Sequence, residues 1–140
     1  MPAPALIGER ILLSLWVGAL WAIGFIAAPV LFALLDDRAL AGSLAGEMFR
    51  AVAYLGLLCG SLLLAFQLLP PNRPRWRLWV LLGMLALVAI GQFVLAPMVA
   101  ELRAAGLSAG PDFGRLHGIA STLYLLTSLA GLALVAFAKD

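Results

Sequence analysis

The sequence predicts an all-α integral membrane protein, a four-helix bundle built from two similar helical hairpins. Hydrophobic residues make up 64% and charged residues 11% of the 140 residues, whereas a soluble domain carries about 25% charged residues. Four uncharged stretches are each about as long as the roughly 20 residues that a helix needs to cross a bilayer. Because lipid offers backbone groups no hydrogen-bond partner, these stretches are expected to be helical. They are Ile11–Leu35, Ala51–Leu69, Leu78–Ala100 and Leu116–Ala138.

The stretches indicate a single transmembrane domain over residues 1–140, with helices at about 8–35, 46–69, 76–99 and 114–138. An even number of spans places both termini and the segment 70–77 on one side. The "RPRWR" at 73–77 and Lys139 add positive charge there, which predicts a cytoplasmic location for this side. All basic residues except Lys139 are arginines, a bias that fits a GC-rich bacterial genome. We therefore expect a bacterial inner-membrane protein with both termini in the cytoplasm.

Two prolines lie deep inside predicted helices one and three. Pro29 and Pro97 cannot donate a backbone hydrogen bond, and each frees the carbonyl four residues earlier, those of Phe25 and Phe93. In a membrane bundle, neighbouring helices, hydroxyl groups or water satisfy such carbonyls. One interpretation is a packing kink. The other is that two bent helices open a small outward-facing cavity for a small molecule or ion.

The two halves of the sequence resemble each other. "AIGFIAAP" at 22–29 corresponds to "AIGQFVLAP" at 89–97, and "DRALAGSLAGEMFR" at 37–50 to "ELRAAGLSAGPDFGR" at 101–115. The order of acid, arginine, two Ala-Gly pairs and phenylalanine is the same in both. The pattern predicts parallel repeats, which transporters often use to build a site at the repeat interface. The alternative is a coincidence in a chain rich in Ala, Gly and Leu.

Polar residues on predicted helix four follow helical spacing and are expected to face the bundle. A histidine changes charge near neutral pH, so His117 would bind a ligand or carry protons, or would simply be solvated at the interface. The candidate cavity residues are Phe25, Pro29, Gln92, Phe93, Pro97, His117, Ser121 and Tyr124. The candidate polar rim at the outer face comprises Asp37, Arg38, Glu101 and Arg103; Asp37 and Arg38 would otherwise form a solvated turn.

No catalytic residue, cofactor or nucleic-acid partner is predicted. The sequence contains no Gly-rich phosphate loop and no HExxH motif, and no basic stripe that would suit nucleic acid. Met48, Met98 and His117 are weak candidates for a Cu(I) site, since thioether and imidazole groups suit that ion. Their spacing matches no metal motif, and a single histidine cannot provide two axial ligands to haem.

Glycine pairs at small-xxx-small spacing predict close helix contacts. Gly56 and Gly60 lie in predicted helix two, and Gly114 and Gly118 lead into predicted helix four. Gly42-xxx-Gly46 has the same spacing but is expected to lie largely in a loop. The helical pairs would pack within the bundle, or dock a second copy or another membrane protein.

Specific stretches resemble a known family. "GFIAAPVLFALLDDRALAGSLAGEMF" at 24–49 and "FGRLHGIASTLYLL" at 113–126 look like the bacterial domain-of-unknown-function family 4149 (DUF4149), related to transmembrane protein 205. The resemblance implies a four-helix membrane protein and no established activity. The layout is more remotely similar to families associated with copper resistance and haem-dependent porphyrinogen oxidation. Those carry a histidine in the first helix, where this chain has Trp16 and Trp21.

Three functions follow as hypotheses. The first is a protein that binds or moves a small molecule or ion through the outward-facing cavity. The second is a non-catalytic structural subunit whose glycine faces dock a membrane partner. The third, the least favoured by these residues, is a copper- or haem-associated redox protein.

Overall fold

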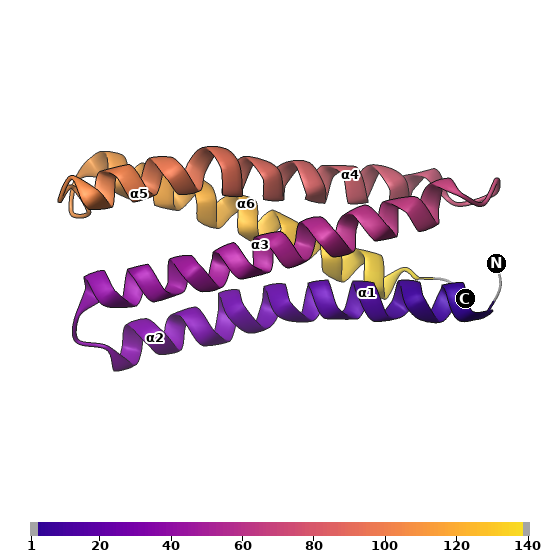
Figure 1. The fold of residues 1–140 in the computed structure, drawn as a ribbon, viewed down its shortest axis with the longest axis horizontal. Helices are drawn as coiled ribbons and strands as arrows, with labels where there is room; N and C mark the ends of the chain where they lie inside the picture. The colour runs from indigo at the N-terminus through magenta and orange to yellow at the C-terminus, as the bar shows by residue number, and fades with distance from the viewer. Residues whose placement is uncertain (1–2, 139–140) are drawn as a thin grey trace.

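A computed structural model describes residues 3–138; Lys139, counted above toward the cytoplasmic charge, lies outside the described residues. The described chain is helical apart from its connections, and four long helices are apolar enough to cross a membrane, as predicted (Figure 1). Two of these four are interrupted by a short π-helical segment. In chain order the elements are α1 (Ala3–Ala22), η1 (Ile23–Ala27), α2 (Ala28–Leu34), α3 (Arg38–Leu68), α4 (Arg75–Ile90), η2 (Gly91–Leu95), α5 (Ala96–Ala104) and α6 (Pro111–Ala136).

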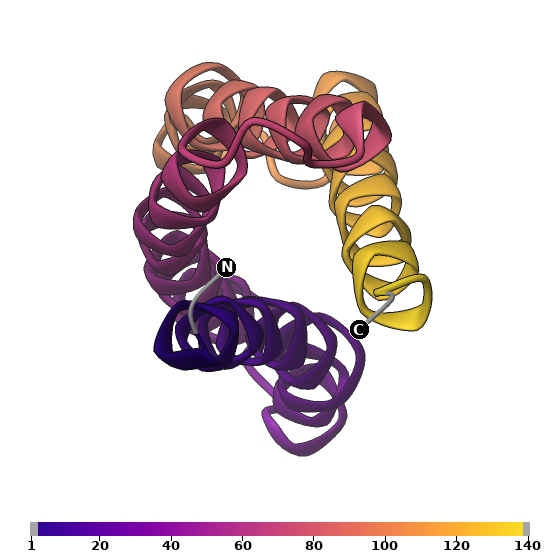
Figure 2. The ribbon, with the colours of Figure 1, turned by 90° about the vertical axis from the view of Figure 1, so that its right-hand side faces the viewer.

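The four long helices run antiparallel in a ring. Helix α1 packs on α3, α3 on α4, α4 on α6, and α6 returns to α1 (Figure 2). The start of α1, the α3–α4 connection and the end of α6 lie at one end, which we call the terminal end. The α2–α3 and α5–α6 connections lie at the opposite end, which we call the far end.

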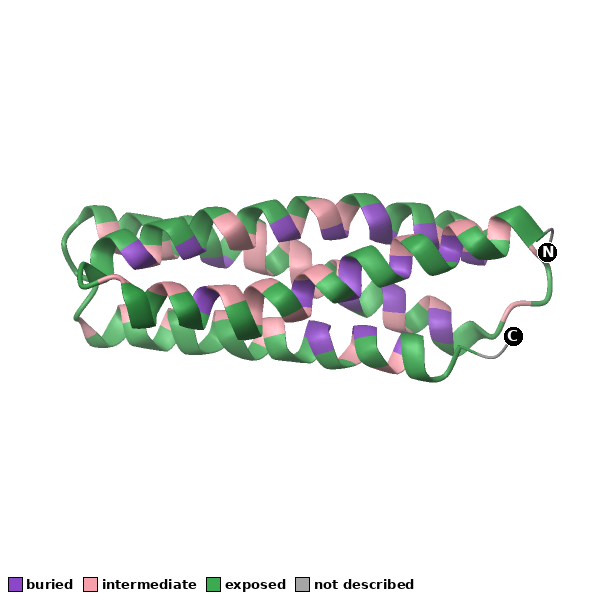
Figure 3. Cartoon of the chain, turned by 90° about the horizontal axis from the view of Figure 1, so that it is seen from below, coloured by how far each residue is buried: buried purple, intermediate pink, exposed green. Residues whose placement is uncertain are grey.

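The core is a thin column of large side chains between the helices, while most of the outer surface is exposed and apolar (Figure 3). Trp16 is fully buried and contacts α3 over two glycines. A Cβ atom at Gly56 would lie 2.5 Å from Trp16 Nε1, and one at Gly60 would lie 2.9 Å from Trp16 Cζ3. The pair therefore packs within the bundle. The exposed apolar surface suits contact with lipid, so the chain is a multi-pass membrane protein.

Both prolines follow a π-helical turn. The Ala28 N–H donates to the Ile23 carbonyl and the Ala96 N–H to the Gly91 carbonyl, so each bond spans five residues instead of four. Such a turn contains one extra residue and is frequent at functional sites. Pro29 and Pro97 each follow this turn after one intervening residue within a continuous helix, so the wider turn accommodates the proline ring and its missing N–H.

Four helix boundaries differ from the expected ones by three residues or more, the first being the start of α1 at Ala3 instead of about 8. Helix α3 begins at Arg38, eight residues before the expected start at 46, because the Asp37 carboxylate caps it and accepts from Ala39 N at 3.0 Å and Leu40 N at 3.1 Å. Gly42 and Gly46 are therefore helical, and the expected loop is wrong. The third span continues to Ala104 and is followed by Gly106 in the left-handed region, at φ 73°. Helix α6 starts at Pro111.

Candidate functional site

The terminal end contains a buried carboxylate surrounded by donors. Glu9 of α1 is only 5% exposed. Arg73, from the α3–α4 connection, binds it through both guanidinium ends, with Nη2 2.8 Å from Oε2 and Nη1 donating to Oε1 at 3.1 Å. Arg77 Nη2 donates to Oε1 at 3.2 Å, and Gln67 Nε2 at 3.2 Å. We call Glu9, Gln67, Arg73 and Arg77 the terminal cluster.

The terminal cluster joins all four long helices. Arg77, at the start of α4, also donates from Nη1 to the Leu134 carbonyl of α6 at 3.3 Å. Gln67 belongs to the last turn of α3, and Glu9 belongs to α1. Two guanidinium groups around one carboxylate leave the cluster with an excess of positive charge. Burying these charges is costly, and the charge-assisted hydrogen bonds offset that cost.

Two buried polar atoms of the terminal cluster have no partner among the described residues. They are Gln67 Oε1, an acceptor, and Arg77 Nε, a donor. Buried polar groups in proteins are nearly always hydrogen-bonded, and an exception calls for a water, an ion or a ligand. The hydrogen bonding of the cluster is therefore incomplete at Gln67 and at Arg77.

A polar hollow of about 270 Å³ adjoins the cluster at the α3–α4 connection. We call it the loop hollow. The first turn of α4 contributes to it, and the cap residue Pro74 makes no side-chain hydrogen bond to the backbone N–H groups of that turn. Arg75 beside it is exposed. The lining residues are Gln67, Leu68, Pro70, Pro71, Arg73, Pro74, Arg75 and Leu78.

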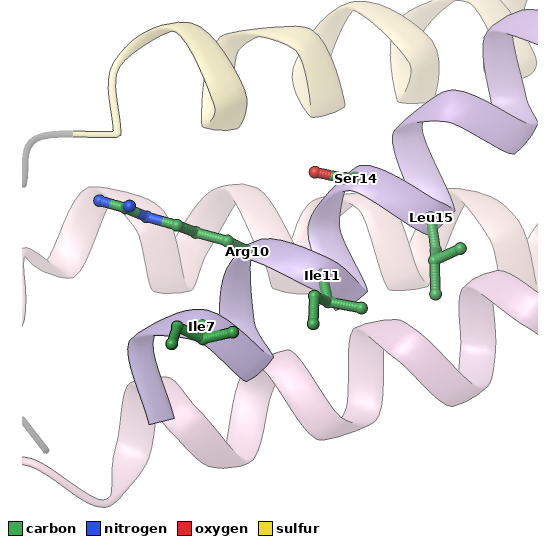
Figure 4. Close-up of a pocket in the computed structure, with 5 residues that line it drawn as sticks. All are labelled: Ile7, Arg10, Ile11, Ser14 and Leu15. Atoms are coloured by element: carbon green, nitrogen blue, oxygen red, sulfur yellow. The ribbon is translucent and has the colours of Figure 1, made fainter. Parts of the chain in front are cut away.

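A second, larger hollow of about 410 Å³ lies against the outer face of α1 (Figure 4). Its lining side chains are Ile7, Arg10, Ile11, Ser14 and Leu15, all from the same helix. A surface formed by one helix and dominated by exposed aliphatic side chains is a shallow apolar groove. It suits an acyl chain of the surrounding lipid better than a specific polar ligand.

The prolines and phenylalanines expected to face a cavity are exposed on the bundle surface. Phe25 is 42% and Phe93 56% exposed, and both Pro29 and Pro97 are exposed. None of the four lines either hollow. Each phenylalanine instead packs against a tyrosine of the opposite hairpin, Phe25 with Tyr124 at 6.3 Å and Phe93 with Tyr54 at 6.4 Å between ring centroids.

The remaining candidate cavity residues lie apart from one another. Tyr124 is half-buried, its hydroxyl donates to the Leu20 carbonyl, and its ring fills the space beside Gly24. Gln92 is half-buried, and Ser121 is exposed. His117 is exposed and stacks on Phe113, at 6.2 Å and an interplanar angle of 5°.

The candidate rim residues at the far end have mainly local roles. Asp37 caps α3, while Arg38 and Glu101 are exposed. The Arg103 guanidinium lies over the Phe113 ring at 5.8 Å. It also covers the small-residue face of α3, because a Cβ at Gly42 would lie 3.3 Å from Arg103 Nη2.

The weak metal candidates come from three different helices. Met48 of α3 is half-buried, Met98 of α5 is 43% exposed, and His117 of α6 faces Phe113. Within residues 3–138, no group of three or more His, Cys, Asp or Glu side chains is placed to hold a metal ion. The copper hypothesis therefore gains no support from the geometry.

The glycine pairs differ in what surrounds them. Gly56 and Gly60 lie under Trp16, whereas a Cβ at Gly114 or Gly118 would meet nothing within 4 Å. The first pair is used inside the bundle. The second is on the exposed face of α6.

The sequence pattern places Arg73, Arg75 and Arg77 on the side of the termini but does not pair them with Glu9. One signal could have found the pair. Glu9 is the only acidic residue before the first apolar stretch, and it falls on the same side as a run of arginines. In a bundle with an even number of spans, the start of the first span and the second connection lie at the same end. The single acidic residue can therefore pair with the arginines of that connection.

The comparisons with known proteins concern the fold family alone. No curated protein and no solved structure matches this chain. The model of one family, described as a domain of unknown function (DUF4149), matches residues 11–108, which include the first span from Ile11 onward, the whole second and third spans, and both π-helical turns. Since the match covers well over half of the chain and agrees with the resemblance of the sequence, the protein belongs to the DUF4149 family.

Proposed function

We propose that this protein is a membrane-embedded binding protein for a small polar ligand, and that the ligand occupies the loop hollow. The observation that carries the proposal is the contact between this hollow and the terminal cluster, since Gln67 and Arg73 belong to both. Charged side chains within a membrane bundle are expensive, and they commonly mark sites for ions or substrates. The location replaces the outward-facing cavity between Pro29 and Pro97 as the first place to seek a ligand.

A purely structural role for the terminal cluster is the competing explanation. A cluster that only joined four helices would be expected to satisfy its own polar atoms. Gln67 Oε1 and Arg77 Nε instead lack partners among the described residues, and Gln67 lines the hollow. This arrangement favours a site that a further molecule completes.

We propose that the two π-helical turns are the segments that bend when the ligand binds. Both interrupt long helices between the terminal and far ends, at Ile23–Ala27 and Gly91–Leu95. Segments of this kind are frequent at functional sites. Transport of the ligand toward the far end would pass these two turns, and we propose them as hinges for such a movement.

A solute screen with a blocked hollow tests the proposal. The purified protein in detergent is heated with panels of small anionic, cationic and neutral solutes, because a ligand of the folded state raises the unfolding temperature in proportion to ln(1 + [L]/Kd). Leu68→Trp fills the loop hollow, and Leu69→Trp is its matched control, since both leucines are exposed and only Leu68 lines the hollow. We expect a solute that stabilises the native protein and the control but not Leu68→Trp. If no solute does so, the binding proposal is wrong.

We also propose that the terminal end lies in the bacterial cytoplasm. Arg10, Arg73, Arg75 and Arg77 are at this end with one described acid, Glu9, whereas the far-end arginines are balanced by acids. Single cysteines at Asn72 and Ser108, in a variant without Cys59, would report the orientation. A membrane-impermeant maleimide added to intact cells should label the Ser108 position only.

A partner-docking role is the second candidate. The observation that favours it is the open space around Gly114 and Gly118 on the exposed face of α6. Glycines in such a position let another helix approach closely. Gly118→Leu should abolish a cross-linked dimer or complex in membranes, and an unchanged cross-linking pattern would count against this role.

We further propose that the two hairpins arose by duplication. The support is local: an Ala-Pro follows a five-residue π-helical turn in each half. A phenylalanine in each turn packs against a tyrosine of the other half. Separately expressed halves, residues 1–72 and 73–140, should then associate in membranes into a complex with the properties of the whole chain.

A further inference from the structure

We propose that the loop hollow binds a phosphate group whose carrier also offers a hydroxyl or amine, the chemistry of a phospholipid headgroup or of a small phosphate ester. This inference rests on the proposed binding function and names the ligand class. It is carried by the charge balance at the terminal end, the start of α4, and the partnerless amide oxygen of Gln67.

The charge at the terminal end favours an anion. Its described residues contain four arginines, Arg10, Arg73, Arg75 and Arg77, and one carboxylate, Glu9. Glu9 is committed to Arg73 and Arg77. Arg75 lines the hollow, is exposed, and forms no ion pair within the described part of the chain. Arg75 would donate charge-assisted hydrogen bonds to a phosphate there, since Glu9 is already the acceptor for Arg73 and Arg77.

The start of α4 adds backbone donors to the same place. Pro74 is the cap residue of this helix, and its side chain accepts no hydrogen bond from the first turn, in which Arg77 N donates to the Pro74 carbonyl at 3.3 Å. The unpaired N–H groups at a helix start, together with the helix dipole, attract anionic groups. Because Pro74 and Arg75 both line the loop hollow, we expect the first-turn N–H groups and the Arg75 guanidinium to contact the same anion.

Gln67 distinguishes among anions. It is 5% exposed, lines the hollow, and its Nε2 is held by Glu9. Its Oε1 has no partner among the described residues and requires a hydrogen-bond donor. Inorganic phosphate at neutral pH carries a hydroxyl only on phosphorus itself, whereas a headgroup or ester carries a hydroxyl or amine several bonds away, which can reach the amide while the phosphate contacts Arg75. A ligand with both groups satisfies the arginine and the amide together.

The surroundings of the hollow fit the membrane interface. Trp76 and Trp79 are 40% and 68% exposed at the beginning of α4, where aromatic side chains mark the headgroup level. Leu68 and Leu78 contribute the apolar part of the lining. Basic hollows between helices at this depth are suited to acidic headgroups. The volume of about 270 Å³ is just below the ~300 Å³ at which drug-sized pockets begin, which is appropriate for a headgroup.

Thermal unfolding with defined phosphates tests the inference. The delipidated protein in neutral detergent is titrated with phosphatidylglycerol, phosphatidylcholine, glycerol 3-phosphate and inorganic phosphate. Arg75→Gln removes the proposed contact, and Arg115→Gln is the matched control, an exposed arginine of α6 at the opposite end. We expect binding of phosphatidylglycerol or glycerol 3-phosphate to weaken about tenfold in Arg75→Gln, the loss of one charge-assisted contact. The control should bind like the native protein.

The outcomes separate the sources and the two proposals. Stabilisation by phosphatidylglycerol alone identifies a lipid headgroup, and stabilisation also by glycerol 3-phosphate identifies a small ester; both support the inference. Equal binding of inorganic phosphate, or equal effects of the two arginine variants, overturns it. A solute that lacks phosphate but is blocked by Leu68→Trp would overturn the ligand class and keep the binding function.

Discussion

Replacement of Glu9 by glutamine should destabilise the bundle far more than an ordinary loss of charge. The change keeps the size of the side chain but removes the negative charge between Arg73 and Arg77, whose side chains are 17% and 11% exposed. Breaking a buried ion pair by removing one partner costs about 3–5 kcal/mol. Arg73 belongs to a connection and can turn toward water, so the lower limit of about 3 kcal/mol applies, roughly a hundredfold in the folding equilibrium.

The matched control is Glu47→Gln. Glu47 pairs with Arg50 at 3.4 Å, and the side chains are 66% and 58% exposed. A pair in such a position contributes about 0–1 kcal/mol. Both variants are unfolded in mixed micelles with a rising fraction of denaturing detergent, followed by tryptophan fluorescence. Equal shifts for Glu9→Gln and Glu47→Gln would refute the buried cluster.

A double variant checks the cause of the loss. Arg77→Gln alone removes a partner of Glu9 and the contact with the Leu134 carbonyl. If the charges act on each other, Glu9→Gln with Arg77→Gln should cost less than the sum of the two single changes. Additive costs would show that each residue acts through packing alone.

Three further changes, with Gly118→Ala as a control, test the helix contacts and helix ends by the same unfolding measurement. Gly56→Ala should cost about 1–3 kcal/mol, because the new Cβ would lie 2.5 Å from Trp16 Nε1, whereas Gly118→Ala meets open space and should be tolerated. Asp37→Ala removes the cap of α3 and should cost about 1 kcal/mol, with fraying of the first turn visible as faster amide exchange. Gly106→Ala places a side chain at φ 73° and should cost about 1–2 kcal/mol.

The spans were predictable because lipid imposes a strict rule on length and composition. The start of α3 was not, because Arg38, Glu47 and Arg50 interrupt the apolar pattern by which spans were recognised. The helix nevertheless begins at Arg38, since its cap at Asp37 depends on hydrogen bonding rather than on apolarity. A search for capping residues before each span would have placed this boundary correctly.

The terminal cluster was beyond local patterns for a different reason. Its partners are separated by 64 residues between Glu9 and Arg73 and by 68 between Glu9 and Arg77. Only the antiparallel ring brings them together. The prolines stand out in the sequence because proline is disfavoured inside a helix. The π-helical turns that accommodate them are visible only in the hydrogen bonding of the backbone.

The long separation within the terminal cluster also sets an order of events during synthesis. Glu9 enters the membrane region with α1 before Arg73 and Arg77 have been made. Its place near the start of that helix lets the carboxylate stay hydrated until the arginines are present. The α1–α3 hairpin can therefore insert first, and the arrival of α4 then draws the waiting charge inward. The ion pair therefore forms late, and the ring of helices closes only after the second half of the chain has been inserted.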